Sequence, residues 1–359
     1  MPFKLPLRIE GGIERLLHGR MVNFTITGWC NARCVFCHFP TVKDRPVVSL
    51  DDAKRAIDAL AKLDVTVLNL TGGEPFLNHS ICDIAAYATA AGMTVYTGTN
   101  GTMMTPAIAD RLAQARLQGV WISYEGPDAE TFDRNRGVKG LTEKIRKGLR
   151  YLKSAGVETF CICVINRTIS DYRAFIDHVV DLGYSTVKFD YPQRRMGSSY
   201  LAFSDWDMLD LSADEMHSAI EQILAIKRER YRGIYVMNGT EGLLGAQRFW
   251  RGEPAKYPCS AGDRVLYLDV NLRLHRCTVL PEQFGKVWDV RPEQLTRIEC
   301  NQCYYQGVRD YDNVYFLFSA LLAGATDVRA GHLLTALGRV ADSRMIGGAR
   351  SVVEFAFRR

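Results

Sequence analysis

Residues 29–38 read Trp-Cys-Asn-Ala-Arg-Cys-Val-Phe-Cys-His, which places Cys30, Cys34 and Cys37 in the spacing C-x3-C-x2-C. Three thiolates this close together suit a [4Fe–4S] cube, whose irons prefer soft sulfur ligands. Because a cube has four irons, three cysteines leave one iron open to a ligand from outside the chain. The alternative is a structural zinc site, in which His38 joins the cysteines as a fourth ligand.

A strand followed by a glycine turn lies about forty residues further on. Residues 65–71, Val-Thr-Val-Leu-Asn-Leu-Thr, are β-branched and aliphatic, which is typical of a buried parallel strand. Gly72-Gly73-Glu74-Pro75 follows directly. Glycines let the backbone approach a ligand closely, and a glutamate can accept a hydrogen bond from an ammonium group.

Strands and amphipathic helices alternate from residue 20 to about residue 191. We predict strands at 22–27, 65–71, 94–99, 120–123, 159–164 and 186–191. Ser49 and Pro106 mark the starts of two intervening helices, and residues 140–155 form a third. Six β/α units predict an α/β fold, a partial (β/α)6 TIM-like barrel with right-handed crossovers. The motifs fall at strand carboxyl ends, where such sheets bind ligands.

The cysteine run and the Thr-Gly-Gly-Glu-Pro run resemble motifs of the radical SAM superfamily. In that family the open iron holds the amino and carboxylate groups of S-adenosylmethionine, and Gly-Gly-Glu binds the methionine amino group. Residues 122–137 resemble a family stretch written I-S-(I/L)-D-G-x-D-x-x-x-H-D-x-x-R-G. The cofactor-binding residues that the resemblance implies are Phe36, Gly72, Gly73, Glu74, Asn100, Ser123 and Asn166.

The chain departs from this family stretch at two places. Tyr124-Glu125 replaces the usual aliphatic-Asp pair, and Phe132 replaces histidine. Either Glu125 takes over the role of the aspartate, or the substrate differs. For Asn166, a solvated loop is the alternative to a contact with S-adenosylmethionine.

Four further cysteines have the spacing C-x17-C … C-x2-C: Cys259, Cys277, Cys300 and Cys303. Residues between the first two alternate like a β-hairpin around 269–272. The pattern resembles the twitch domain, a shortened relative of the SPASM domain, although Leu272 stands where that family has a glycine. The resemblance implies an auxiliary [4Fe–4S] cluster without an open iron, which suits electron transfer. A four-cysteine zinc site is the alternative.

Composition bounds the class of protein. The 359 residues are 47% hydrophobic and 24% charged, which describes a soluble globular protein. A net charge of +5 fits anionic small molecules but is too diffuse to indicate nucleic acid. Residues 314–325 are apolar but too short to span a bilayer, so we expect a buried helix and no membrane partner. With many thiols and no signal-peptide pattern, a cytoplasmic location is expected.

We expect five segments along the chain. They are an N-terminal extension (1–20), the radical SAM partial barrel (21–191), a connecting helical segment (192–254), the auxiliary-cluster domain (255–305) and a C-terminal helical segment (306–359). A capping box at Ser212 opens a helix to about residue 230. The remaining cysteines, Cys82, Cys161 and Cys163, are predicted to be core residues.

The resemblance implies reductive cleavage of S-adenosylmethionine to a 5′-deoxyadenosyl radical, which takes a hydrogen atom from a substrate. A closed auxiliary cluster favours oxidation of an alcohol in a small molecule such as a sugar, aminocyclitol or nucleoside. Twitch enzymes that oxidise an aminocyclitol alcohol are the closest architectural match. An external electron donor such as flavodoxin or ferredoxin is then required. Candidates for the base that removes the hydroxyl proton are Asp190, Tyr191, Arg194 and Arg195, with surface or salt-bridge roles as the alternative.

The sequence is also compatible with other functions. One is redox-neutral chemistry on a sugar-nucleoside, such as decarboxylation, with arginines holding a carboxylate. Another is peptide modification, although such SPASM enzymes usually carry more auxiliary cysteines and often an added peptide-binding domain. A non-catalytic metal-binding protein and an activase of a partner protein are further alternatives. We expect the substrate pocket between residues 190 and 258 and in the C-terminal helices.

Overall fold

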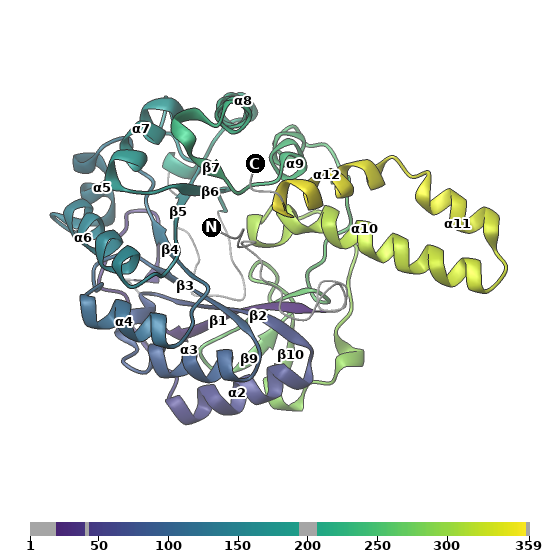
Figure 1. Ribbon diagram of the computed structural model, residues 1–359, viewed down its shortest axis with the longest axis horizontal. Coiled ribbons are helices and arrows are strands. Elements are labelled where there is room, and N and C mark those ends of the chain that lie inside the picture. The colour runs from purple at the N-terminus through teal and green to yellow at the C-terminus, as the bar shows by residue number, and fades with distance from the viewer. Residues whose placement is uncertain (1–18, 40–42, 194–206, 357–359) are drawn as a thin grey trace.

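The computed structural model describes residues 19–39, 43–193 and 207–356. Within these residues, ten strands form one curved sheet in the order β10-β9-β8-β1-β2-β3-β4-β5-β6-β7. Each neighbouring pair from β8 through β1 to β7 is parallel, and helices cover the outside of the curve (Figure 1). The predicted α/β fold with a partial TIM-like barrel is confirmed.

The barrel strands are β1 (Arg20–Thr27), β2 (Val65–Gly72), β3 (Thr94–Thr99), β4 (Gly119–Ser123), β5 (Thr159–Val164), β6 (Thr186–Asp190) and β7 (Tyr235–Val236). The first six match the predicted strands closely. β7 was not predicted, because the barrel was expected to end at residue 191. Its two residues pair with Thr186 and Val187 of β6, and so short a strand has no alternation to indicate it.

The surrounding helices are α2 (Leu50–Lys62), α3 (Ile81–Ala90), α4 (Pro106–Gln114), α5 (Ala129–Arg136), α6 (Leu141–Ser154), α7 (Tyr172–Leu182), α8 (Ala213–Glu229) and α9 (Thr240–Trp250). The predicted start signals hold. The Ser49 hydroxyl accepts from the Asp52 N–H, Pro106 is the first residue of α4, and Ser212 forms a capping box with Glu215.

The region of the second cysteine set contributes β8 (Val265–Leu268), β9 (Arg273–His275) and β10 (Gln283–Lys286). The predicted hairpin is present as β8 and β9, which pair antiparallel. However, β8 also pairs parallel with β1, so these strands extend the barrel sheet. At the hairpin tip Leu272 has a φ of 60°, a left-handed conformation that favours glycine and accounts for the residue type expected there.

The hydrophobic core lies between the sheet and the outer helices. Cys82, Cys161 and Cys163 are buried in it, as predicted. Cys161 and Cys163 lie on the same side of β5, because successive side chains of a strand alternate between its faces. The opposite side of β5, with Ile162 and Val164, faces the cavity inside the barrel.

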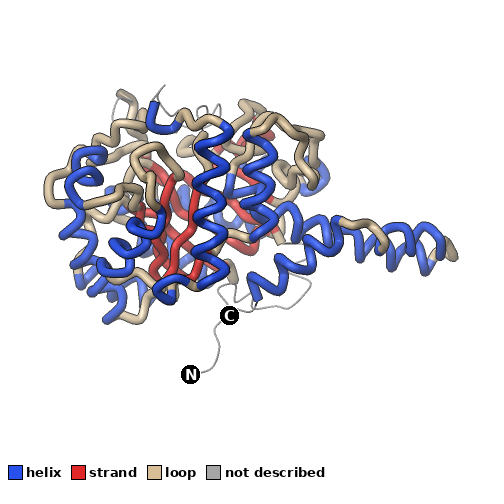
Figure 2. Tube along the Cα trace, turned by 90° about the horizontal axis from the view of Figure 1, so that it is seen from above, coloured by secondary structure: helices blue, strands red, loops and turns tan. Residues whose placement is uncertain are grey.

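Three helices follow the second cysteine set: α10 (Gln306–Arg329), α11 (Leu333–Val340) and α12 (Arg344–Ala356). The first half of α10 borders the cavity inside the barrel, while its second half and α11 project from the body (Figures 1 and 2). The expectation of a buried helix at 314–325 is therefore only half right, because Leu321 and Leu322 are 45% and 38% exposed. Within the described chain, no helix combines the length and apolarity needed to cross a membrane.

A buried polar network fastens α10 to the barrel. The Asp310 carboxylate accepts from Tyr191 Oη (2.9 Å), Asn238 Nδ2 (2.9 Å) and Gln306 Nε2 (2.8 Å). Asn238 also pairs with the backbone of Phe189, accepting from its N–H (2.7 Å) and donating to its carbonyl (2.8 Å). The side chain of Asn238 thus acts as a short continuation of β7 along β6.

We predict that Asn238→Ala lowers the free energy of unfolding by about 3 kcal/mol, because it leaves the buried backbone groups of Phe189 without partners. Urea unfolding of the apo-protein measures the change. Asn271→Ala, at an exposed position, is the control and should stay within about 0.5 kcal/mol of wild type. Equal effects of the two substitutions would contradict the structural role of Asn238.

Candidate active site

A cavity of about 440 Å³ runs through the inside of the barrel. Ten of the residues singled out in the sequence line it: Cys30, Cys34, Phe36, Cys37, Gly72, Gly73, Asn100, Ser123, Glu125 and Asp190. Strand β6 and helix α10 supply the opposite wall, with Lys188, Asp310 and Tyr311. The motifs therefore lie at the carboxyl ends of the strands, around one cavity. Of the C-terminal helices, α10 contributes its first part to the cavity wall.

The loop with the first three cysteines follows β1. Backbone hydrogen bonds from Arg33 to Arg136 and from Val35 to Asn135 fix this loop against the end of α5. Burial raises the pKa of Cys30 to about 11 and the pKa of Cys37 to about 12. Buried thiols of this kind ionise when a metal supplies positive charge, as thiolate ligation of iron requires.

The glycine turn after β2 touches this loop directly. A Cβ on Gly73 would lie 2.0 Å from the carbonyl oxygen of Trp29, so any side chain would force the two segments apart. The Glu74 N–H donates to that same carbonyl (2.6 Å). The turn and the cysteine loop thus form a backbone cradle beside three soft sulfur donors, which fits an iron–sulfur cluster with a small polar ligand next to it.

The side chain of Glu74 is engaged in hydrogen bonds within the protein. Its carboxylate is fully buried and accepts from Thr99 Oγ1 (2.7 Å), the Asn100 N–H (2.6 Å) and the Phe76 N–H (3.2 Å). It does not line the cavity, whereas the neighbouring Gly72, Gly73 and Pro75 do. In this geometry the carboxylate joins the ends of β2 and β3, while the backbone of Gly72 and Gly73 borders the cavity.

Arg136 is a site residue that the sequence analysis missed. Its guanidinium is buried and donates to both carboxylate oxygens of Glu125, and Nη1 lies 3.5 Å from Cys34 Sγ. Burial alone would lower the pKa of Arg136, but Glu125 and Cys34 outweigh this effect and raise it. A fixed positive charge therefore lies beside one cysteine. Its place before Gly137, at the end of the family stretch, was the available signal.

The two departures from the family stretch prove to be connected. The rings of Tyr124 and Phe132 stack with centroids 4.0 Å apart, and Tyr124 Oη lies 2.6 Å from His178 Nε2. Neither ring lines the cavity. Tyr124 and Phe132 therefore pack against each other away from the cavity, while Glu125 serves as the partner of Arg136.

Several predicted site residues lie elsewhere. Asn166 is buried outside the cavity lining and donates to the carbonyls of Val164 (2.8 Å) and Glu125 (3.2 Å). Tyr191 also lies outside the lining, with its hydroxyl on Asp310. Arg194 and Arg195 fall outside the described residues. Of the four base candidates, Asp190 is the one that the structure places on the cavity wall.

Asp190 is accompanied by a lysine that the sequence analysis also missed. Lys188 lies two residues earlier on β6, so both side chains point into the barrel. Burial raises the pKa of Asp190 to about 7, Lys188 opposes this shift and Asp310 adds to it. One oxygen of Asp190, Oδ1, is buried without a hydrogen-bond partner among the described residues. The wall opposite the cysteine loop is thus polar, and it contains a carboxylate oxygen without a hydrogen-bond partner in the part of the chain that the structure describes.

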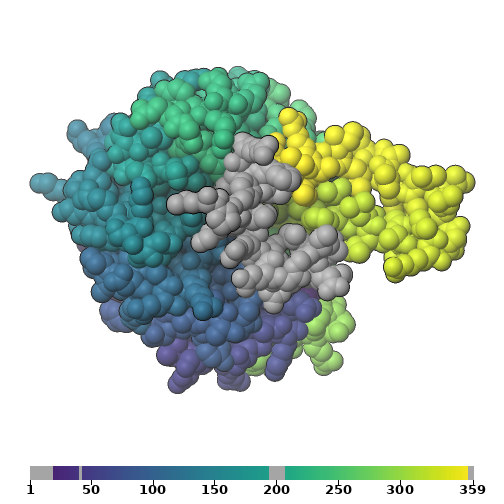
Figure 3. Space-filling model, in the orientation of Figure 1, coloured from purple at the N-terminus to yellow at the C-terminus, as the bar shows by residue number. Residues whose placement is uncertain are grey.

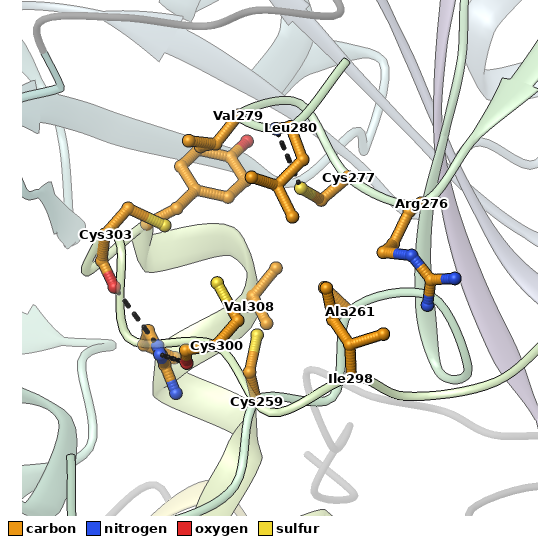
Figure 4. A pocket seen from close by; sticks show the side chains of 12 residues that line it. Cys259, Ala261, Arg276, Cys277, Val279, Leu280, Ile298, Cys300, Cys303 and Val308 are labelled. Atoms are coloured by element: carbon orange, nitrogen blue, oxygen red, sulfur yellow. Dashed lines mark hydrogen bonds between the residues drawn. The ribbon is translucent and has the colours of Figure 1, made fainter. Parts of the chain in front are cut away.

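The second cysteine set also gathers around one space. Cys259, Cys277, Cys300 and Cys303 line a small cavity at the start of α10, and Figure 4 shows their side chains around it. The remaining lining is mostly apolar: Ala261, Val279, Leu280, Ile298 and Val308. Burial raises the pKa of Cys259 to about 12 and of Cys303 to about 11. Four sulfur donors in an apolar shell fit an iron–sulfur cluster.

Arg309 holds the turn that carries two of these cysteines. Its guanidinium donates to the carbonyls of Cys300 (2.9 Å) and Cys303 (3.4 Å), and it pairs with Asp312 at 3.1 Å. Over the described ranges, no three histidine, cysteine or carboxylate side chains converge closely enough to hold a single metal ion. The thiols of a cube bind separate irons and lie farther apart than the ligands of one ion.

Comparison with known proteins identifies the class. The radical SAM superfamily model matches residues 24–179, a range that includes the cysteine loop, the glycine turn and β1 to β5. Residues 24–179 are therefore a radical SAM domain. Proteins of this superfamily carry a [4Fe–4S] cluster and cleave S-adenosylmethionine, which agrees with the three thiols and the backbone cradle.

Curated relatives share this part of the chain. An AdoMet-dependent heme synthase of Methanosarcina barkeri is 37% identical over 138 residues, which are 38% of this chain and 40% of that protein. The mycofactocin maturase MftC of Mycolicibacterium smegmatis is 28% identical over 207 residues, 57% of this chain and 51% of the maturase. The matched region thus spans about two fifths to one half of these relatives.

Solved structures support the fold. Streptococcus suis SuiB bound to S-adenosylmethionine superposes with a TM-score of 0.58 at 14% identity, covering 76% of this chain and 64% of SuiB. The enzyme anSMEcpe with bound AdoMet gives a TM-score of 0.57 at 14% identity, covering 77% of this chain and 80% of its own. At such identities the likeness concerns the fold alone.

We predict that Glu125→Gln destabilises the apo-protein by about 3–5 kcal/mol, because it leaves the buried Arg136 guanidinium without its anionic partner. Urea unfolding measures the loss. Glu143→Gln removes the exposed partner of Arg146 and should cost less than about 1 kcal/mol. A similarly small loss for Glu125→Gln would show that the buried pair is not a structural support of the cysteine loop.

Proposed function

We propose that this chain is a radical SAM oxidoreductase that oxidises an alcohol of a small molecule held in the barrel cavity. The observation that supports it best is the position of this cavity between two cysteine sets. Cys30, Cys34 and Cys37 line the cavity itself, and Tyr305 lines both this cavity and the pocket of the other four cysteines. Such an arrangement suits removal of a hydrogen atom at one end and of an electron at the other.

The residues of the chain divide into two groups in this proposal. Cys30, Cys34 and Cys37 hold the first cluster, and the backbone of Gly72 and Gly73 receives the amino group of S-adenosylmethionine. The four later cysteines, Cys259, Cys277, Cys300 and Cys303, hold the auxiliary cluster. When bound, the first cluster and S-adenosylmethionine supply hydrogen-atom removal from a C–H bond, and the auxiliary cluster supplies an electron acceptor.

Asp190 is the proposed proton acceptor. Converting an alcohol to a carbonyl removes a hydrogen atom and an electron from the carbon and a proton from the hydroxyl. Asp190 faces the cavity, has an unpartnered oxygen and has a pKa of about 7, so an ionised carboxylate is available at neutral pH. Tyr191, whose hydroxyl is committed to Asp310, does not share these properties.

Iron content tests the two-cluster arrangement. After anaerobic reconstitution with iron and sulfide, we expect about eight irons per wild-type chain. The variant with Cys259, Cys277, Cys300 and Cys303 all replaced by alanine should retain about four and still cleave S-adenosylmethionine. Cys82→Ala, which removes a core thiol, is the control and should keep the wild-type count. An equal count in wild type and the four-cysteine variant would refute the auxiliary cluster.

The pH profile tests Asp190. Because the carboxylate must be ionised to accept a proton, alcohol oxidation should fall about tenfold per pH unit below about 7. The ionisable groups close enough to interact electrostatically with this carboxyl are Lys188 on its own strand, Asp310, Tyr305 and, from the far side of β5, Cys163. Asp190→Asn should abolish oxidation and leave cleavage of S-adenosylmethionine intact. Oxidation by this variant with the wild-type pH profile would exclude Asp190 as the acceptor.

A second candidate is peptide modification, which the similarity to mycofactocin maturase over 57% of this chain favours. Fractionation of a cell extract by size separates the two functions. If the filtrate below peptide size accelerates cleavage of S-adenosylmethionine, the substrate is a small molecule. If acceleration requires the retained, protease-sensitive fraction, the substrate is a peptide.

A further inference from the structure

We propose that Lys188 and Asp190 form a recognition site for a substrate that carries a carboxylate near the hydroxyl to be oxidised, that is, a hydroxy acid. This inference rests on the proposed function and adds the substrate class. Lys188 binds the carboxylate, and Asp190 accepts the hydrogen bond of the hydroxyl. Both side chains come from β6 and line the same cavity wall.

Lys188 is a buried cation with spare hydrogen-bonding capacity. Lys188 is only 6% exposed, and its Nζ donates to Tyr311 Oη at 3.1 Å. Nζ also lies 5.4 Å from the ring centre of Trp121 and 5.0 Å from that of Tyr311. An ammonium group has three N–H donors, so one hydroxyl leaves two for a ligand.

Lys188 is not explained by an internal ion pair. Within the described ranges, no carboxylate oxygen lies within 4.0 Å of its Nζ, although Asp190 and Asp310 are close enough to favour its charge. Lys227 shows how this chain pairs a mostly buried lysine that serves structure. Its Nζ donates to the Asn238 carbonyl (2.8 Å) and lies 3.5 Å from the Glu354 carboxylate. A buried charge without such partners is costly unless a ligand supplies them.

The two carboxyl groups near Lys188, those of Asp310 and Asp190, differ in how fully they are hydrogen-bonded. Asp310 accepts three hydrogen bonds from side chains and fastens α10, so it is committed to the fold. Asp190 leaves Oδ1 buried and unpartnered among the described residues. The cavity wall thus presents one cation and one open acceptor. A ligand that satisfies both has an anionic group and a hydroxyl donor on neighbouring atoms.

The walls next to this pair indicate the rest of the substrate. Aromatic rings surround the cavity here, among them Tyr96, Trp121 and Tyr315. These rings offer apolar contact area to a ligand body. An aromatic hydroxy acid therefore satisfies the whole region, and 3-phenyllactate is a suitable probe of it.

Calorimetric titration of the reconstituted protein with matched ligands tests the site. The ligands are 3-phenyllactate, 3-phenylpropanoate, which lacks the hydroxyl, and 2-phenylethanol, which lacks the carboxylate. We expect 3-phenyllactate to bind about tenfold more tightly than either analogue, as the loss of one charge-assisted hydrogen bond predicts. N-acetylphenylalanine carries a carboxylate like that at the end of a peptide. If it binds more weakly than 3-phenyllactate, the site prefers a free hydroxy acid, as proposed. If it binds more tightly, the site prefers a peptide end and the hydroxy-acid proposal is wrong.

Substitutions of Lys188 test whether this residue causes the preference for 3-phenyllactate. Lys188→Met should bind 3-phenyllactate and 2-phenylethanol about equally, whereas Lys188→Arg should keep most of the preference. Lys153→Met, at an exposed position on α6, should bind all ligands as wild type does. Thermal unfolding confirms that each variant is folded, and the ligand series on wild type needs no variant.

Two outcomes would overturn the inference. One is a wild-type protein without preference for 3-phenyllactate over 2-phenylethanol, and the other is an unchanged preference in Lys188→Met. The proposed function fails differently, through absence of S-adenosylmethionine cleavage or of a second cluster. Because ligand binding, iron content and cleavage are measured separately, the two failures are distinguishable.

Discussion

The hydrogen bond from the Glu74 N–H to the Trp29 carbonyl is the contact on which the site depends. It joins the segment after β1, which carries the first three cysteines, to the turn after β2. The contact requires that Gly73 have no side chain, because a Cβ would lie 2.0 Å from the same carbonyl oxygen. The buried carboxylate of Glu74 then ties this turn to β3 through Thr99 and Asn100. Three strand ends are therefore held in register around one space.

Charge is distributed around that space in an ordered way. Arg136 places a fixed cation next to Cys34, and Glu125 balances it from within the core. On the opposite wall Lys188 is left with a neutral hydroxyl as its hydrogen-bond partner. Buried charges are costly without partners. The two cations differ in this respect, because among the described residues Arg136 has an anionic partner and Lys188 does not. The paired one supports the loop, and the incompletely paired one is available to a ligand.

Local patterns explain why the sequence predicts that these motifs gather at one cavity. The thiols of Cys30, Cys34 and Cys37 and the glycines after β2 are short-range signals, and parallel strands bring their carboxyl ends to one edge. Lys188 could have been noticed, because it lies two residues before Asp190 on the same strand and therefore shares its inward face. Asp310 and Tyr311 could not, since their contribution depends on where α10 docks. The motif locates Glu74 after β2, but the partners of its side chain follow from tertiary contacts that the motif does not specify.

The pairing of β8 with β1 has a consequence for how the two cysteine sets are placed relative to one another. Cys30 follows the carboxyl end of β1, whereas Cys259 precedes the amino end of the parallel strand β8. The two sets therefore lie at opposite edges of one sheet, and the length of a hydrogen-bonded strand pair separates them. The hydrogen-bonded pairing of β1 with β8 fixes this separation. The second half of α10 and α11 contribute nothing to this separation, because they project to one side of the body (Figure 3).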